Sequence, residues 1–235
     1  LSYSNLTSLN LSGANLTGAN LTWTSLAGAN LSGGTLTSSI IDNAYFSNAN
    51  LTNVTSGKMS GTVGELPVNW TVGNGYFVGP GANLTNADLS KISLANVSLA
   101  GATLTGVSSG GIQGTPIAVP ATWKLVAGYL AGPTAVLSNA NLANADLNGV
   151  SLATASLSGV RSGGVTGTIA ALPAKWKLTS GYLIGPGADL SDANLTAADL
   201  SSVSLAGVVL DRVRSSGMTG TPTDIPAPWK IIGLS

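Results

Sequence analysis

Large apolar residues recur at every fifth position along the first part of the chain. A small residue commonly stands two positions before each of these centres, Asn commonly precedes the centre, and Ser or Thr commonly follows it. This period fits neither an α-helix, which repeats about every 3.6 residues, nor a flat strand, which repeats about every 2. It fits a chain that turns a corner every five residues and points the centre and the small residue inward. The centres are Leu1, Leu6, Leu11, Leu16, Leu21, Leu26, Leu31, Leu36, Ile41, Phe46 and Leu51.

The composition indicates an ordered chain with an uncharged surface. Only 8% of the 235 residues are charged and 44% are hydrophobic, so the chain does not have the low hydrophobicity and high charge of disordered proteins. The formal net charge is zero, which disfavours a nucleic-acid binder. No apolar run approaches the length of a membrane span. Because the repeat is already in phase at Leu1, we expect the chain to be a processed form.

The tandem pattern Ala-(Asp/Asn)-Leu-x-x resembles the pentapeptide-repeat family, and the resemblance covers most of the chain. It implies an all-β fold, a right-handed, four-sided parallel β-helix with about four pentapeptides in each coil. We therefore expect a single elongated solenoid over residues 1–235, with Leu stacked on Leu inside and Ala and Val between them.

A second period of 53 residues is superimposed on the first. It is marked by Trp70, Trp123, Trp176 and Trp229, and Pro67, Pro120, Pro173 and Pro226 keep the same spacing. In each module a Ser replaces the expected Leu after five centres, as at Ser109, Ser162 and Ser215. We expect plain pentapeptides over 1–55, further pentapeptide blocks at 84–108, 137–161 and 190–214, and insertions at 56–83, 109–136, 162–189 and 215–235.

The insertions have the sequence of a short hairpin. In Leu172–Leu190, LPAKWKLTSGYLIGPGADL, the proline indicates a segment that leaves the wall, and two short apolar stretches flank a tight turn. The first copy carries Asn74-Gly75 at this turn, a strong hairpin signal. We expect one β-hairpin or loop excursion in each module, about 13 residues long if a regular coil takes about 20.

The aromatic residues of the insertions are the candidate site. If modules stack in register, the Trp residues form one column and the Tyr residues a second. We favour a packing role in which the rings fix each hairpin to the wall. The alternative is an exposed ridge that contacts a glycan or a neighbouring copy. The residues concerned are Trp70, Trp123, Trp176, Trp229, Tyr76, Tyr129 and Tyr182.

The residues most often used in catalysis and metal binding are missing. The chain contains no His and no Cys, so the commonest bases, nucleophiles and metal ligands are absent. We expect no enzyme activity, no cofactor and no metal. Asp189, Asp192 and Asp199 are the nearest approach to a carboxylate cluster, and a weak calcium site there is a remote alternative.

The preferred function is a structural protein that self-associates end to end or laterally, with filaments as one form of the assembly. We expect it outside the cell or at its surface; a cytoplasmic location stays open. We expect no nucleic-acid partner. The alternative is a protein- or glycan-binding module. The resemblance also implies gyrase inhibition by DNA mimicry as a possible function class. Such mimicry needs an acidic surface, so the zero net charge disfavours it. Ice binding through the Thr/Ser/Asn ladder is a third, more distant hypothesis.

Overall fold

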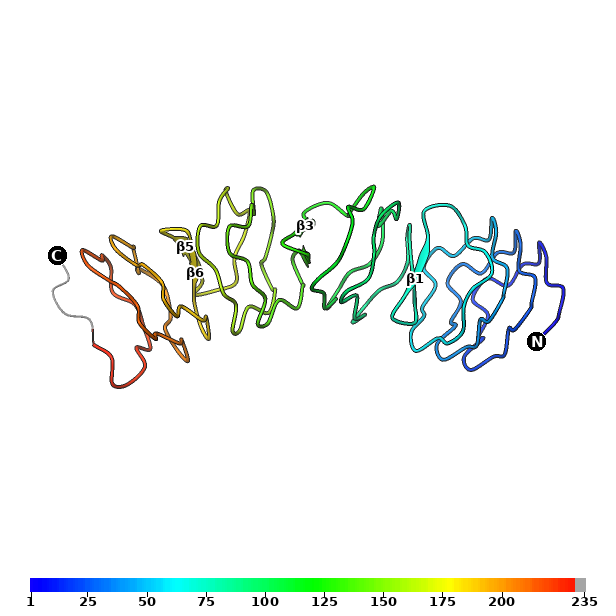
Figure 1. The fold of residues 1–235 in the computed structure, drawn as a ribbon, viewed down its shortest axis with the longest axis horizontal. Helices are drawn as coiled ribbons and strands as arrows, with labels where there is room; N and C mark the ends of the chain where they lie inside the picture. The colour runs from blue at the N-terminus through cyan, green and yellow to red at the C-terminus, as the bar shows by residue number, and fades with distance from the viewer. Residues whose placement is uncertain (231–235) are drawn as a thin grey trace. The chain divides into compact units, whose positions relative to one another are not determined.

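The structure is a computed structural model that describes residues 1–230, and within this range it contains strands, turns and isolated bridges but no helix. The chain forms two compact units, Leu1–Ala121 and Thr122–Ser235. Within each unit the chain winds into coils that stack on one another (Figure 1). The last five residues of the insertion expected at 215–235 lie outside the described residues.

A regular coil contains 20 residues, so each pentapeptide forms one of its four sides. The residue before each centre pairs with the residue 20 positions later in a parallel bridge. In the first unit, one side of the solenoid is the column Asn5, Ser25, Tyr45 and Glu65, and the next is the column Asn10, Asn30 and Asn50.

Where Asn precedes the centre, every backbone N–H group of a regular pentapeptide can have a partner, as the segment Asn30 to Gly34 shows. One N–H donates to the previous coil, two donate to the next coil, one closes a turn, and one donates to a side chain. The bonds are Asn30 N to Leu9 O at 2.9 Å, Leu31 N to Asn50 O at 2.9 Å, Gly33 N to Thr52 O at 2.9 Å, Gly34 N to Leu31 O at 2.9 Å, and Ser32 N to Asn30 Oδ1 at 3.1 Å. The Asn that precedes a centre is therefore needed as an acceptor for an N–H group that no coil satisfies.

The corner of each pentapeptide requires a left-handed backbone. The second residue after the centre has positive φ, for example +69° at Gly33 and +57° at Asn53. Together with the hydrogen bond that closes the turn, this is the geometry of a type II turn, which favours Gly and Asn at this position. These two residue types recur there in the sequence for this reason.

The centres and the small residues before them fill the interior. Leu26, Leu31, Leu36 and Ala29 are all 0% exposed. Burying a leucine side chain contributes about 1.5–3 kcal/mol, so the stacked centres are the main source of stability.

Three antiparallel hairpins interrupt this pattern. They pair β1 (Thr71–Gly73) with β2 (Tyr76–Val78), β3 (Lys124–Val126) with β4 (Tyr129–Ala131), and β5 (Lys177–Thr179) with β6 (Tyr182–Ile184). Each has a two-residue turn in which both residues have positive φ, a pattern typical of type I′ turns. The turn residues are Asn74-Gly75, Ala127-Gly128 and Ser180-Gly181.

A hairpin adds eight residues to its coil rather than the 13 or so expected. Thr55 pairs with Asn83 and Arg161 pairs with Asp189, so the coil that holds a hairpin spans 28 residues. Most of the segment before the first hairpin stays in the wall, where Ser60 pairs with Ile40. A 53-residue module is therefore one such coil and five more pentapeptides, or two and a quarter coils.

This quarter coil moves each hairpin to the neighbouring side of the solenoid, as the second unit shows. The hydroxyl of Tyr129 accepts a hydrogen bond from the N–H of Asn141, which belongs to the column that continues through Arg161 and Asp189. The hydroxyl of Tyr182 accepts from the N–H of Asn194, one pentapeptide beyond that column. In this unit the Tyr and Trp residues therefore do not form the single columns that the 53-residue spacing suggests.

Candidate functional site

The second strand of each hairpin (β2, β4 and β6, the inner strands) lies in the interior of the solenoid. Side chains of adjacent strand residues point in opposite directions. Nevertheless Leu183 and Ile184 of β6 are both 0% exposed. Leu183 packs in a cluster with Leu157 and Val160, whereas Ile184 packs in the next cluster. The strand thus separates two hydrophobic clusters, and the segment does not bulge off the wall as its proline suggested.

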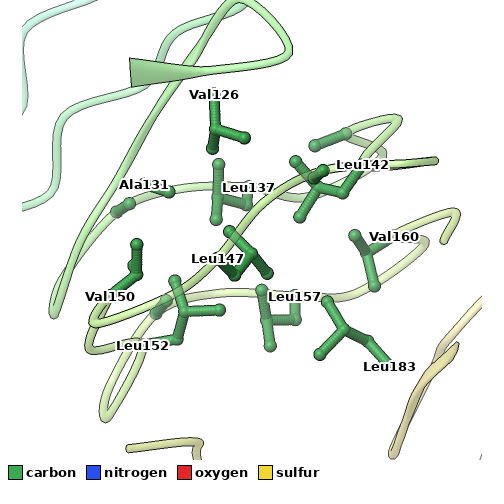
Figure 2. Close-up of a cluster of buried hydrophobic side chains, with 14 of the residues drawn as sticks. Val126, Ala131, Leu137, Leu142, Leu147, Val150, Leu152, Leu157, Val160 and Leu183 are labelled. Atoms are coloured by element: carbon green, nitrogen blue, oxygen red, sulfur yellow. The ribbon is translucent and has the colours of Figure 1, made fainter. Parts of the chain in front are cut away.

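Figure 2 shows the cluster between the two hairpins of the second unit. Val126 of β3 lies near Leu137 at one end, and Leu183 lies near Leu157 and Val160 at the other. Each hairpin therefore closes one section of the core.

The serine that replaces a centre accepts a hydrogen bond from a backbone N–H group of the inner strand. Ser56 Oγ accepts a hydrogen bond from the N–H of Phe77 at 2.9 Å, and Ser162 Oγ accepts from the N–H of Leu183 at 2.9 Å. Ser56 is only 7% exposed, and a buried N–H group without a partner would cost about 1–3 kcal/mol. A leucine at either position could not accept the bond, which explains why serine replaces the centre at Ser56 and Ser162.

The tyrosines hold the inner strands against the wall. The rings of Tyr76 and Tyr182 lie on Gly57 and Gly163, where an added Cβ would be 3.0 and 3.2 Å from the ring. These glycines directly follow the accepting serines. Ser and Gly together therefore hold the inner strand in place. The serine accepts a hydrogen bond from the strand, and the glycine leaves space for the tyrosine ring.

The tryptophans pack on the glycine that follows each inner strand. An added Cβ on Gly79, Gly132 or Gly185 would lie 2.1, 2.0 or 2.2 Å from Cδ2 of Trp70, Trp123 or Trp176. All three Trp rings are half-buried. These contacts give the rings a packing role within the hairpin. A lateral contact with a partner through the same residues stays a prediction.

The sequence pattern shows the serines that replace a centre, but it did not reveal that they and the nearby glycines receive the inner strand and the aromatic rings. The signal was present, because Ser56 and Ser162, like Gly79 and Gly185, recur at the same place in each module. The replacement of an inward leucine by serine indicates that another polar group enters the interior at that level.

Ion pairs fix the first strand of two hairpins to the wall of the second unit. Lys124 Nζ lies 2.5 Å from Asp146 Oδ2, and one module later Lys177 pairs with Asp199. Asp199 also accepts the N–H of Ser201, and the hydrogen bond from Lys177 is the main cause that lowers the pKa of this carboxyl to about 2.

The three aspartates proposed as a remote calcium site each pair with a different cation. Asp189 Oδ2 lies 2.5 Å from Arg161 Nε, and Asp192 receives both Nε and Nη2 of Arg212. Hydrogen bonds from the hydroxyl of Ser191 and from Arg161 lower the pKa of Asp189 to about 2. No group of three potential metal-ligating side chains occurs among residues 1–230. The described part of the chain also contains no helix that could cross a membrane.

Comparison with protein families identifies the repeat. The model for pentapeptide repeats, eight copies long, matches residues 1–33, 81–108, 135–161 and 186–214. The chain belongs to the pentapeptide-repeat family. The predicted family and its right-handed, four-sided β-helix are thereby confirmed. Pentapeptide-repeat proteins are in general non-enzymatic scaffolds with structural or protein-interaction roles.

Among solved structures, the chain is similar to HetL from the cyanobacterium Nostoc, a pentapeptide-repeat protein involved in heterocyst differentiation regulation. The identity is 21%, the TM-score is 0.23, and the match covers 92% of this chain and 89% of HetL. It is also similar to QnrB1, a plasmid-mediated fluoroquinolone resistance protein, with 15% identity, a TM-score of 0.22, and coverage of 90% and 81%. Likeness at this level says nothing about the role of this chain. No curated protein sequence matches it.

The contact between Trp176 and Gly185 leads to a first prediction. Gly185→Ala should destabilise the protein by about 3 kcal/mol, because the new methyl group would overlap the indole ring. The midpoint of urea unfolding measures the effect. Gly149→Ala is the matched control, since its Cβ meets nothing within 4 Å and only the φ of +75° opposes it, at about 1 kcal/mol.

A double variant tests whether the indole is responsible. In a Trp176→Ala background, Gly185→Ala should cost less than about 1 kcal/mol, because the ring it would overlap is gone. An equal loss in both backgrounds would contradict the contact.

The interactions of the Asp189 carboxylate predict a loss of stability in acid. Hydrogen bonds from the Ser191 hydroxyl and then from Arg161 hold its folded pKa at about 2, below the value of about 3.9 in unfolded chains, so these interactions stabilise the fold above pH 4 and their contribution disappears as the pH falls from about 4 to 2. Asp189→Asn retains an oxygen that can accept the N–H of Ser191 but removes the charge. It should lower Tm at pH 7 and flatten the decline below pH 4. Parallel Tm curves for the variant and the wild type would exclude this role.

Proposed function

We propose that the chain is a non-enzymatic structural protein that assembles with further copies of itself, end to end or side by side, into filaments. We further propose that it acts outside the cell or at its surface. The observation that supports assembly most strongly is the main-chain hydrogen bonding between coils. Each side of a coil offers the same backbone donors and acceptors to whichever coil lies against it.

Backbone pairing of this kind does not depend on the identity of the outward side chains. An unpaired sheet edge binds a further strand from the same or another molecule. A coil of one copy therefore offers a coil of another copy the same backbone hydrogen-bond donors and acceptors that successive coils offer each other within the chain.

The interior shows what coverage by a second coil contributes. Leu6, Leu11 and Leu16, which one coil covers on one side, are half-buried, whereas Leu26 and Leu31, covered on both sides, are 0% exposed. Since full burial of a leucine contributes about 1.5–3 kcal/mol, covering such a coil recovers a substantial part of that amount at each centre.

The outer wall places little charge in the way of a lateral contact. The net charge is zero, and in the second unit Asp146, Asp189, Asp192, Asp199 and Asp224 are paired with cations. Two copies can therefore approach without the repulsion that a strongly charged surface creates.

The test is the mass of the purified protein as a function of concentration. Light scattering after size-exclusion chromatography should show species larger than the 23.2 kDa chain, growing over a hundredfold or so increase in concentration. Negative-stain microscopy should show particles that lengthen or thicken in parallel. A monomer at every concentration would contradict the proposal.

Two matched variants separate an end contact from a general effect of charge. In a purified protein limited to these 235 residues, Leu9→Lys places a cation on the first coil, where Leu9 is 45% exposed, and should suppress end-to-end growth. Val68→Lys, at a residue that is 82% exposed and far along the chain from that coil, should leave growth unchanged. Equal behaviour of the two variants would argue against an end contact.

One observation favours the alternative of a protein- or glycan-binding module. Trp23, Ile40 and Tyr45 are 46%, 39% and 39% exposed. The backbone N–H of Trp23 donates to Asp42 O, which places Trp23 one coil from the corner between Ile40 and Tyr45. An exposed group of this kind is common in binding surfaces. A monomer that binds immobilised glycans, and loses binding on Trp23→Ser, would favour this function instead.

A further inference from the structure

The first unit carries carboxylates that are not neutralised by a neighbouring cation. The five ion pairs found among residues 1–230 all lie in the second unit. The acidic residues of the first unit are Asp42, Glu65 and Asp88, its basic side chains are Lys58 and Lys91, and none of these belongs to an ion pair of the described residues. The surface of this unit therefore offers unpaired negative charge to a partner.

Two of these carboxylates lie on either side of the ring of Tyr45. The ring lies against Gly64 on the next coil, where an added Cβ would be 3.3 Å from Tyr45 Cε1. Glu65, which is exposed, is the bridge partner of Tyr45 on that coil, so its side chain lies beside Tyr45 on the outer wall. Asp42 Oδ1 accepts the N–H of Thr62 at 3.1 Å, which places the other carboxylate at the corner before Gly64.

Apolar side chains extend this surface. Tyr45 and Ile40 are each 39% exposed, and Trp23 is 46% exposed. Ile40 precedes the Asp42 corner on the same coil, and the backbone N–H of Trp23 donates to Asp42 O from the coil on the opposite side to Gly64. The exposed group is therefore larger than one side chain of a partner would cover, which favours a polypeptide over a small cation.

We propose that this surface of the first unit binds an arginine-containing segment of a partner protein. The guanidinium group stacks on the exposed face of the Tyr45 ring, and its N–H groups donate to Glu65 on one side and to Asp42 on the other. Arginine fits this arrangement better than lysine, because its guanidinium group is planar, stacks on aromatic rings and directs several donors at fixed angles. Apolar residues that adjoin the arginine contact Trp23 and Ile40.

This inference goes beyond the proposed self-assembly and does not rest on it. The partner needs only an accessible arginine between apolar residues, so it need not be a copy of this chain. Light scattering of the samples used below measures self-assembly separately, and either proposal can therefore fail alone.

The test is isothermal titration calorimetry of the intact protein with the capped peptide Gly-Leu-Arg-Leu-Gly at low ionic strength. Binding should be saturable, with one peptide per chain. Replacing the arginine by citrulline, which keeps the planar shape but removes the charge, should weaken binding about tenfold, and replacing it by lysine about threefold. N-acetylarginine amide at the same concentration should not saturate the protein, because it lacks the apolar residues.

Variants of the protein locate the binding surface. Glu65→Gln should weaken binding about twofold to fivefold, as expected for the loss of one exposed ion pair. Tyr45→Ser should weaken it about fivefold to tenfold because the ring is lost, whereas Tyr45→Phe keeps the ring and should bind like the wild type. Asp88→Asn is the matched control for charge, since Asp88 is the bridge partner of Ser108 and lies outside the column of Tyr45. It should leave the affinity unchanged.

Four outcomes would overturn the proposal. They are absence of binding at millimolar peptide, equal binding of the arginine and citrulline peptides, saturation by N-acetylarginine amide at the same affinity as the peptide, and equal losses of affinity in Glu65→Gln and Asp88→Asn. Binding to immobilised glycans that Tyr45→Ser abolishes, in a protein that does not bind the peptide, would assign the surface to a glycan instead.

Discussion

The fold depends on the placement of the five backbone N–H groups of each pentapeptide. Three of them pair with neighbouring coils and one closes the corner; where Asn or Asp precedes the centre, the fifth donates to its side chain, as in Asn30 to Gly34. Buried N–H groups must be satisfied, and this arrangement satisfies all five without a helix or a long strand. This arrangement explains the residue type at each position: leucine points inward, glycine or asparagine stands at the corner, and Asn or Asp precedes the centre.

The hairpins use the same requirement to bring additional chain into the interior. An inner strand introduces a further N–H group, and the serine that replaces a centre accepts a hydrogen bond from it. The strand also needs space in the interior, which the absence of the leucine side chain and the following glycine provide. Trp and Tyr then pack on glycines on either side. Because a module is two and a quarter coils long, the two hairpins of the second unit lie on neighbouring sides of the solenoid.

The sequence predicts the parts of the structure that depend on local pattern. The period of five gives the coil and its inward residues, and Asn74-Gly75 gives the first hairpin turn. Two features could not be predicted: that the hairpin enters the interior, and that a module is a quarter of a coil longer than two coils. Both depend on how many residues the hairpin adds to its coil. Eight residues shift the next module by one side; a 13-residue excursion would have kept the Trp residues in one column. The role of Ser162 depends on a contact with Leu183, 21 residues away in the sequence, which no local pattern contains.

Amide hydrogen exchange tests most directly whether the inner strands lie in the interior and are held by serine. If they do, the N–H groups of Phe77 and Leu183 should exchange as slowly as those of coil centres such as Leu26 and Leu142, because all four open only when coils separate. Ser162→Ala should speed exchange at Leu183 and leave Leu26 unchanged. Exchange of Phe77 and Leu183 as fast as that of the exposed Val68 would show that the hairpins lie outside the core and would contradict this structure of the module.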